Sequence, residues 1–482
     1  MAKKGFQCNF APIKLLSEDQ VDEIHRSTLR VLEETGLKIE HERALKLLAK
    51  NGCKVDFDTS QVKFPPRLVE ECLQMCPKSF RVRARNPEND LILGENTLYF
   101  GTSPGMDTVD LDTWEARRPT KKEFYDATTL TDALDNPHIT MNYYPWFGWD
   151  ELPPNMCIPE GFAARVRNTS KPLCTAYSNN CEIFTIQMAQ AVGAEAFLAP
   201  YASAPLTYYG EGIEALFRIV EAGFPMRCCA GETMGATAPA TVAGAIVSSS
   251  ATALATLVLT QCIRPGARVA TLCGAFSQNM KSGLIDFGSI QESLHRAAFI
   301  QYWRWLKIPT MTLTTFTNSK SIDFQNGYER AIATTIGALS GVNILQTVGC
   351  IYGELTLHPL QIVLDDDIAN MVGRFIEGIK VDEETLAVDL IHEVGPIPGM
   401  HLDKAHTRKW WQSEGFITKA ADKLGIAEWM ATGKKNSLDY AQERMEKILA
   451  TYKPLPLTPR QEEDIDRILK ECWEYYRKKD ML

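Results

Sequence analysis

Short apolar runs alternate with helical runs between residues 97 and 350, and this alternation constrains the fold more than any other feature. The apolar runs are continuous rather than alternately apolar and polar, which is typical of parallel strands that are covered on both faces. Helical segments such as 121–134, 212–223, 290–306 and 327–341 separate them. The strand-like runs lie at residues 98–102, 139–144, 172–177, 202–208, 225–230, 268–273, 310–315 and 343–348.

Eight strands with helical crossovers over roughly 250 residues have the size of a (β/α)8 barrel. A doubly wound open sheet is the alternative, but no GxGxxG motif follows the first run, which weakens its dinucleotide-binding form. We therefore predict an α/β protein of three parts. Residues 1–96 form a mainly helical extension, residues 97–350 form the barrel, and residues 351–482 form a helical region packed on the barrel.

Charge and hydropathy exclude several classes of partner. The 482 residues include 51 basic and 60 acidic side chains, a formal net charge of -9, which argues against nucleic acid or an anionic membrane as the main partner. Residues 240–262 carry no charge and could span a bilayer by length, but they are mostly Ala, Ser and Thr. We expect a buried helix there. The first residues lack the apolar core of a signal peptide, so we expect a cytoplasmic protein.

The cysteines and the helix caps give more local expectations. Thirteen cysteines without a CxxC pair indicate reduced, mostly buried thiols. Ser17 with Gln20, and Thr458 with Gln461, have the spacing of capping boxes. Three aspartates at 365–367 precede the helical segment 368–378, so we interpret them as partners of its dipole.

Side chains that follow barrel strands are the natural candidates for function, because barrel enzymes build their sites at the carboxyl ends of the strands. Here aromatic side chains and a few carboxylates dominate, and basic side chains are scarce. Such a set suits a cation with apolar surface, held by ring faces and steered by carboxylates. The alternative is that these rings belong to the core or to a subunit interface.

Metal and hydrolase sites have weaker support. His401 and His406 are five residues apart, whereas histidines that share a helical metal site are four apart. No GxSxG elbow of a serine hydrolase occurs. We predict no metal site.

Five motifs in this order resemble the trimethylamine methyltransferase superfamily, in the large branch that lacks pyrrolysine, over residues 15–475. They are "GATAPATVAGAIV" (235–247), "PGARV" (265–269), "TNSKSIDFQNGYE" (317–329), "DEETLAVDLIHEVGPIPGMHLDKAHT" (382–407) and "YKPLPLT" (452–458).

The resemblance implies a (β/α)8 barrel that transfers a methyl group from an amine to the Co(I) of a separate corrinoid protein. Members with pyrrolysine act on trimethylamine, and the matching position here is Gly353, in "GCIYGELT". Members with an ordinary residue there are associated with glycine betaine, proline betaine, carnitine or γ-butyrobetaine. The implied partners are such a betaine and a corrinoid protein at the barrel mouth, with no cofactor bound tightly by this chain.

The predicted site follows from these considerations. Two competing activities, direct methyl transfer to tetrahydrofolate and betaine binding without catalysis, stay open. The long Ala-rich helix and the ring-rich turn at 142–154 hint at a homo-oligomer, and Trp149 is expected at the rim of that turn. Asn318 and Lys320 are further candidates for the substrate carboxylate. The predicted substrate-binding residues are Tyr143, Tyr144, Trp146, Phe147, Phe316 and Tyr352 as the cage, Glu211, Glu232 and Glu354 as the source of negative potential, and Gln325, Gly353 and His358.

Overall fold

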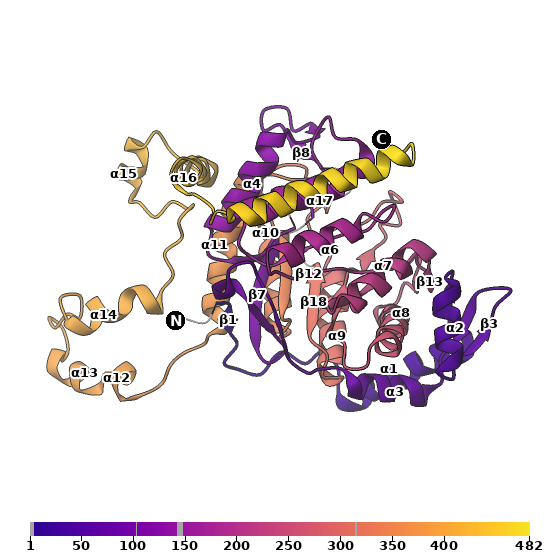
Figure 1. The fold of residues 1–482 in the computed structure, drawn as a ribbon. Coiled ribbons are helices and arrows are strands. Elements are labelled where there is room, and N and C mark those ends of the chain that lie inside the picture. The colour runs from indigo at the N-terminus through magenta and orange to yellow at the C-terminus, as the bar shows by residue number, and fades with distance from the viewer. Residues whose placement is uncertain (1–3, 103, 142–147, 314–315) are drawn as a thin grey trace.

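The computed structural model describes residues 4–102, 104–141, 148–313 and 316–482 of a mixed α/β protein (Figure 1). A central sheet runs in the order β1-β7-β19-β18-β16-β14, and β10 pairs with Phe100 and Gly101 of β7, beyond the residues that pair with β1. All its strand pairs are parallel except that of β1 with β7. Its strands are β1 (Phe6–Gln7), β7 (Thr97–Thr102), β10 (Pro137–Ile139), β14 (Met226–Ala230), β16 (Val269–Cys273), β18 (Thr310–Leu313) and β19 (Ile344–Val348).

Two short strands lie between β10 and β14 in the chain. β11 (Leu173–Cys174) and β12 (Ala196–Phe197) form a parallel pair of their own. Single parallel bridges join Thr140 to Leu173 and Leu198 to Met226. The pair is therefore linked to β10 on one side and to β14 on the other by one bridge each.

The fourth predicted strand, at 202–208, was wrong. The strand next to β14 in space is β12, which is followed by the bridge of Leu198 to Met226; its two residues are fully buried, and it lies before the predicted segment. Thr207–Tyr208 form β13, which pairs instead with β2 (Leu37–Ile39) in an outer sheet with β3 (Lys54–Asp56) and β4 (Gln61–Lys63). Pro205 interrupts the predicted run, because proline cannot donate to a strand ladder.

Helices cover the sheet in the places that the sequence predicts. α4 (Lys121–Ala133), α7 (Gly210–Glu221), α9 (Ile290–Trp305) and α10 (Phe324–Leu339) match the predicted segments. α5 (Cys157–Asn168) and α6 (Glu182–Ala191) complete the crossovers around β11 and β12.

The uncharged segment forms α8 (Val242–Ile263), the one described helix that is long and apolar enough to cross a membrane. It packs against β14, α9, α1 (Glu18–Arg30) and α3 (Pro66–Met75), and most of it is buried inside the protein. The prediction of a buried helix is confirmed, because its small side chains let strands and helices approach on several sides.

Both predicted capping boxes are present. Ser17 and Gln20 cap α1, and Thr458 and Gln461 cap α17 (Pro459–Lys478), which packs on α5 and α6. Twelve of the thirteen cysteines are buried and all are free thiols. The remaining N-terminal elements are α2 (Glu42–Lys50), β5 (Phe80–Val82) and β6 (Leu91–Leu93), with single turns at 31–35 and 87–89.

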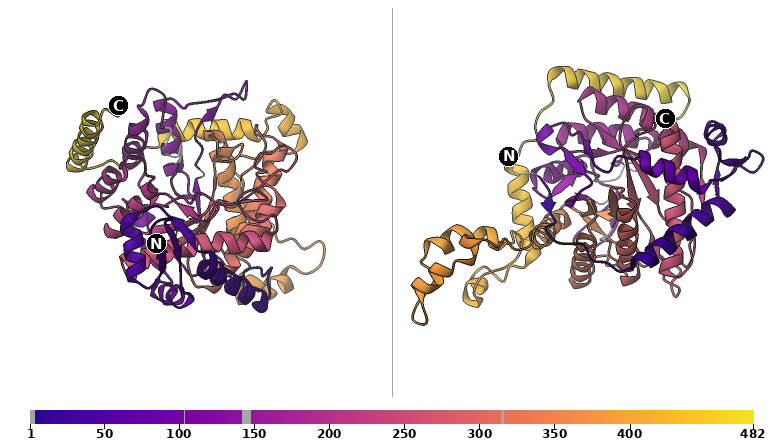
Figure 2. Two further views of the ribbon diagram at one scale, coloured as in Figure 1. Left: turned by 90° about the vertical axis from the view of Figure 1, so that its right-hand side faces the viewer. Right: turned by 90° about the horizontal axis from the view of Figure 1, so that it is seen from below.

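The segment from 377 to 434 projects from the body (Figure 1; Figure 2). It carries the short helices α12 (Glu383–Leu386), α13 (Val388–Val394), α14 (Ala405–Glu414) and α15 (Ile426–Ala431) before the chain returns through α16 (Ser437–Thr451).

The interpretation of Asp365–Asp367 as dipole partners was wrong. α11 (Pro359–Ile376) begins six residues earlier, so all three aspartates lie within it and are buried. Asp366 pairs with Arg444 at 2.6 Å, and Asp367 accepts hydrogen bonds from the backbone of Lys419 and Ala420.

Asp365 forms a buried ion pair with Arg330 of α10. The Arg330 Nε donates to Asp365 Oδ1 at 2.9 Å, and its Nη1 donates to the carbonyl of Cys350 at 2.7 Å. Asp365 also accepts from the backbone N–H of Gly349 at 2.7 Å and from Gln361 at 2.8 Å. The pair therefore ties α10 and α11 to the chain that leaves β19.

Arg330→Met is expected to lower the free energy of unfolding by about 3–5 kcal/mol, because Asp365 would be left charged, buried and unpaired. The double variant Arg330→Met, Asp365→Leu should recover part of this loss. Urea unfolding measures both. Lys14→Met, which breaks an ion pair whose side chains are 69% exposed, should cost less than about 1 kcal/mol. Equal losses for Arg330→Met and Lys14→Met would contradict the assigned role.

Candidate active site beyond the carboxyl ends of the strands

Four of the predicted cage residues lie outside the described part of the chain. These are Tyr143, Tyr144, Trp146 and Phe147. Trp149 is described, and the expectation that it forms the rim was wrong. It is buried, and its ring packs edge-on against Phe124 of α4 at 5.3 Å.

Four other rings form a cluster where strands β16, β18 and β19 end. Phe276 of β17 (Phe276–Ser277) stacks on Phe316 at 5.9 Å between ring centroids. Phe287 packs edge-on against both, at 5.5 Å and 5.6 Å, and reaches Tyr352 at 6.4 Å. The structure thus brings the predicted Phe316 and Tyr352 together with two rings that were not in the predicted site. The three phenylalanines are buried, and Tyr352 is half-buried.

A tight hairpin delivers Tyr352, Gly353 and Glu354 to this cluster. It joins β20 (Cys350–Ile351) to β21 (Thr356–Leu357). The backbone N–H of Tyr352 donates to Ser319 at 2.9 Å, and that of Gly353 donates to Thr317 at 2.8 Å. Gly353 has a φ of +64°, and a Cβ there would overlap the ring of Phe287. This position therefore requires glycine for both its backbone and its contact.

Two predicted carboxylates, Glu232 and Glu354, lie near the ring cluster. Glu232 follows β14 and is 1% exposed. Its Oε1 accepts from Thr252 at 2.7 Å, and its Oε2 has no hydrogen-bond partner among the described residues. Burial raises the pKa of Glu232, and it also raises that of Glu354, where the charge of Arg296 acts in the opposite direction. Burial raises the pKa of the Cys229 thiol in β14, and the charges of Glu232 and Glu354 raise it further.

A buried ion pair lies behind the rings. Arg296 and Glu292 are four residues apart on α9 and are joined at 3.2 Å. Arg296 also donates to the carbonyl of Ala275 at 3.1 Å, and its guanidinium lies 5.8 Å from the ring centroid of Phe276. Sequence reasoning missed this pair because charged residues at this spacing are more often exposed helix partners.

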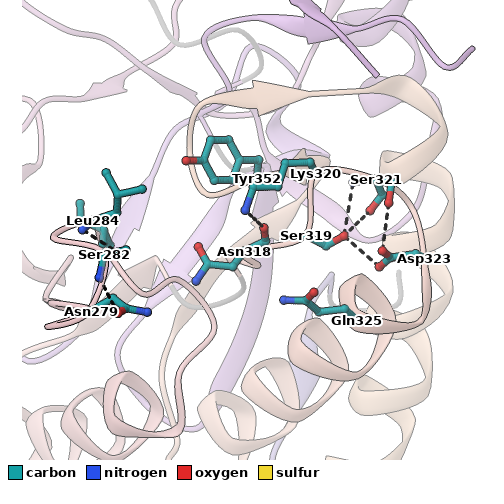
Figure 3. Close-up of a pocket in the computed structure, with 11 residues that line it drawn as sticks. Asn279, Ser282, Leu284, Asn318, Ser319, Lys320, Ser321, Asp323, Gln325 and Tyr352 are labelled. Atoms are coloured by element: carbon teal, nitrogen blue, oxygen red, sulfur yellow. Dashed lines mark hydrogen bonds between the residues drawn. The ribbon is translucent and has the colours of Figure 1, made fainter. Parts of the chain in front are cut away.

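A cavity of about 440 Å³ opens beside Tyr352 (Figure 3). The predicted Gln325 lines it and donates to Glu329 at 2.9 Å. Lys320 lies over the ring of Tyr352, with Nζ 4.5 Å from the centroid, and donates to the carbonyl of Asn318 at 2.6 Å. The wall of the cavity is thus polar, with an ammonium group held at its aromatic edge.

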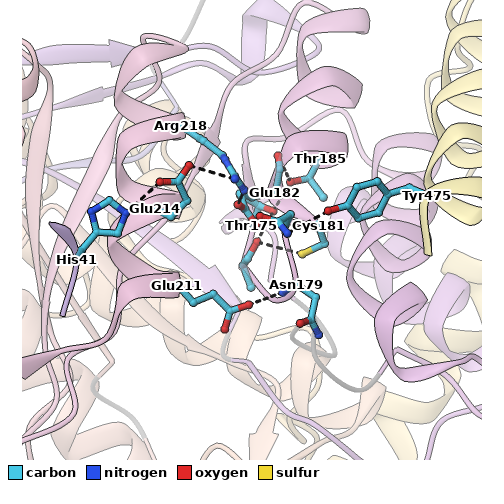
Figure 4. Close-up of polar contacts among 12 residues, drawn as sticks. His41, Thr175, Asn179, Cys181, Glu182, Thr185, Glu211, Glu214, Arg218 and Tyr475 are labelled. Carbon is cyan, nitrogen blue, oxygen red and sulfur yellow. Dashed lines mark hydrogen bonds and ion pairs between the residues drawn. The ribbon is translucent and has the colours of Figure 1, made fainter. Parts of the chain in front are cut away.

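The other two predicted residues have contacts elsewhere. Glu211 is exposed at the start of α7 and accepts from the backbone N–H of Asn179, beside a network in which Arg218 contacts Glu182 and Glu214 (Figure 4). His358 caps α11, where its Nδ1 accepts from the N–H of Leu360 at 3.1 Å. Burial lowers the pKa of His358 to about 4, so it is neutral at pH 7 and has no charge to offer a carboxylate. The described contacts of neither residue include the ring cluster.

No group of three or more His, Cys, Asp or Glu side chains within the described ranges is arranged to hold a metal ion. The site consists of aromatic rings, two carboxyl groups and amide groups, and these suit the binding and orientation of a cation.

Comparison with known proteins shows the family to which the chain belongs. The family described as "Trimethylamine methyltransferase (MTTB)" matches residues 2–472. The chain belongs to this family. It is 29% identical to a trimethylamine methyltransferase of Desulfitobacterium hafniense, over 95% of this chain and 94% of the relative. It is 28% identical to a glycine betaine methyltransferase of the same species, over 92% and 94% of the two chains.

A solved structure supports the fold. The crystal structure of the monomethylamine methyltransferase of Methanosarcina barkeri superposes with a TM-score of 0.53 at 10% identity, covering 98% of this chain and 90% of that one. At this identity the likeness concerns the fold alone. The family resemblance drawn from the five motifs is confirmed by the family match.

Gly353→Ala is expected to reduce the free energy of unfolding by about 2–4 kcal/mol, since it adds both left-handed strain and an overlap with Phe287. Gly193→Ala is the matched control, because Gly193 has a φ of +72° and nothing within 4 Å of an added Cβ. It should cost only the strain, about 1–2 kcal/mol. Equal losses in urea unfolding would remove the contact with Phe287 from the explanation.

Stability should also depend on Glu292. Burial raises the pKa of Glu292 to about 7, against the opposing charge of Arg296. The folded protein therefore holds this proton more tightly than the unfolded chain, so the stabilisation is complete below about pH 4.5 and is lost as pH rises through about 7. Urea unfolding between about pH 5 and pH 8 should show a falling free energy, to which this group contributes on the order of 3 kcal/mol. Glu292→Gln should flatten that fall, and an unchanged slope would contradict the assignment.

Proposed function

We propose that the protein transfers a methyl group from a quaternary amine of the betaine class to the Co(I) of a separate corrinoid protein. Membership of the methyltransferase family supports methyl transfer, and the likeness to a glycine betaine methyltransferase supports the substrate class. The observation that carries the proposal is the ring cluster, in which Phe276, Phe287, Phe316 and Tyr352 meet near the buried Glu232 and the half-buried Glu354.

We also propose that the strands close into a (β/α)8 barrel. β7, β10, β14, β16, β18 and β19 form one parallel set, and the bridges Thr140–Leu173 and Leu198–Met226 run in the direction that would insert β11 and β12 between β10 and β14. The ring cluster would then lie at the mouth, where barrel enzymes hold their substrates.

The glycine at 353 supports a quaternary substrate. The space into which a side chain at this position would point is filled by Phe287, so the cluster presents ring faces rather than a reactive group. Transfer from a quaternary nitrogen releases a neutral amine, so the leaving group needs no proton. The tasks of the chain are then to orient one N-methyl group and to exclude water.

Each end of a betaine has a matching group in the site. Ring faces hold a methylated cation, and the buried Glu232 and the half-buried Glu354 would add negative potential when ionised. Lys320, Asn318 and Gln325 line the adjoining cavity, where an ammonium and two amides could receive the substrate carboxylate. The described contacts give no such part to Glu211 or His358. The corrinoid, carried by its own protein, would supply the nucleophile, and the open side of this cavity offers a place for that protein to dock.

The test is a substrate panel with free cob(I)alamin as the methyl acceptor. Glycine betaine, proline betaine, carnitine, γ-butyrobetaine and trimethylamine are each mixed with the protein, and corrinoid absorbance reports methylation. We expect methylation with at least one betaine and none with trimethylamine. Transfer to tetrahydrofolate but not to cobalamin, or betaine binding without transfer to either acceptor, would overturn the proposal.

With the active betaine, Tyr352→Ala should lower kcat/KM by about 100-fold, because a ring face of the cage is lost. Tyr352→Phe should keep most of the rate, since it keeps the ring. Met75→Ala is the control, because Met75 is 44% exposed on α3, away from the cluster. A rate for Tyr352→Ala equal to that of the control would remove Tyr352 from the site.

A further inference from the structure

The projecting segment exposes an unusual amount of apolar surface. No residue from Glu377 through Lys419, here called the arm, is buried. Ten of its large apolar side chains are between 51% and 95% exposed. Apolar exposure on this scale is rare on a monomer, and apolar patches of this kind mark interaction sites. The ten are Ile379, Val381, Leu386, Val388, Ile391, Ile397, Met400, Leu402, Trp411 and Ile417.

The arm is nevertheless built as a defined structure. Asp382 and Thr385 form a capping box at α12, and Lys404 of the following turn pairs with Glu393 of α13 at 2.9 Å. Lys409 of α14 pairs with Glu384 of α12. These bonds join the helices of the arm to one another but bury none of their apolar faces. Helices of 4 to 10 residues are marginal in water without such burial.

The base of the arm is fixed to the body next to an apolar groove. Arg374 of α11 donates to the carbonyl of Ser413 at 3.0 Å and to that of Gly378 at 2.8 Å, so both ends of the arm meet at one side chain. Beside it a groove of about 810 Å³ is lined by Phe10, Met371, Phe375, Ile379 and Phe416, with a few polar residues. Met371 and Phe375 are 55% and 63% exposed.

The apolar surface continues from the groove onto the neighbouring helix. Phe324, Tyr328 and Ile332 are spaced four residues apart on α10, which packs on α11, and they are 86%, 43% and 49% exposed. Phe324 adjoins Asp323 and Gln325, which line the cavity of the candidate site. The body thus carries an uncovered apolar face from the base of the arm to the edge of that cavity.

We propose that the arm is an exchange element that packs on the α10–α11 face of a second copy of this chain. One chain carries both an uncovered projection and an uncovered face, and a two-fold pairing covers both in two copies at once. Three ion pairs, of which Lys380 with Asp382 at 2.5 Å is one, engage part of the charged groups of the arm within it, and its exposed apolar side chains are the surface that a second copy would cover. Obligate contacts between copies have this apolar character. The proposal assigns the interface of the predicted homo-oligomer to the arm of one copy and the α10–α11 face of another.

The test is the mass of the full-length protein in solution by light scattering over a range of concentrations. The wild type should form an assembly of two or more 53.9 kDa chains. Ile391→Glu with Leu402→Glu should weaken association by at least 100-fold and shift the mass towards one chain. Phe57→Glu with Ile92→Glu is the matched control, since these side chains are exposed on the N-terminal sheets and the assembly should persist.

Hydrogen exchange of the wild type is a second test of the interface, and it does not depend on the folding of any variant. The amides of α13 and α14 should be protected at high protein concentration and should exchange faster on dilution. A monomeric wild type at every concentration, or an arm variant that assembles like the wild type, would overturn the proposal. So would a monomer whose arm becomes protected only by a corrinoid protein or by lipid vesicles.

Discussion

The buried pair between Arg330 and Asp365 is the interaction on which the arrangement of the site depends. It joins two adjacent helices to the chain segment that leaves β19, because Asp365 accepts a hydrogen bond from the N–H of Gly349 and Arg330 donates one to the carbonyl of Cys350. The hairpin that follows carries Tyr352, Gly353 and Glu354 over the ends of the strands. Both charges are taken out of water, so neither can be left without the other. The position of the hairpin is therefore specified by charge, and its fine placement by the glycine that meets Phe287.

The candidate site is formed mainly by the packing of aromatic side chains. Phe276, Phe287 and Phe316 come from segments that follow different strands, and they meet because parallel strands deliver their following residues to one end of a sheet. Two acids and an ion pair lie around these rings in a buried interior, where burial raises the pKa of Glu232, Glu354 and Glu292. A cation that enters would meet ring faces and carboxyl groups whose affinity for protons is already high. Within a methyltransferase family, such a set of rings and carboxyl groups suits the binding and orientation of a cation.

Much of the fold could be predicted from the sequence, and the failures have physical causes. Periodicity located α4, α7, α9 and α10, and short-range spacing located both capping boxes, because these features depend on neighbours in the chain. The strand next to β14 in space was misplaced because β12 has only two residues and its burial comes from distant segments. Asp365–Asp367 were misread because a helix start and a buried ion pair look alike until the partner, Arg330 or Arg444, is known. The candidate site, too, was predicted only in part. Phe316 and Tyr352 follow predicted strands, whereas Phe287 lies in a loop and carries no local signal.

The sequence by itself determined the family, the positions of α4, α7, α9 and α10, the buried nature of α8 and the scarcity of basic side chains after the strands. These are properties of residue order, and they hold whatever the chain packs against. Only the tertiary structure decided which rings meet, that Gly353 faces Phe287, that His358 caps a helix, and that the arm leaves its apolar side chains uncovered. Each of these depends on pairs of residues far apart in the chain. Contact between such residues follows from packing in three dimensions, which local sequence pattern does not encode.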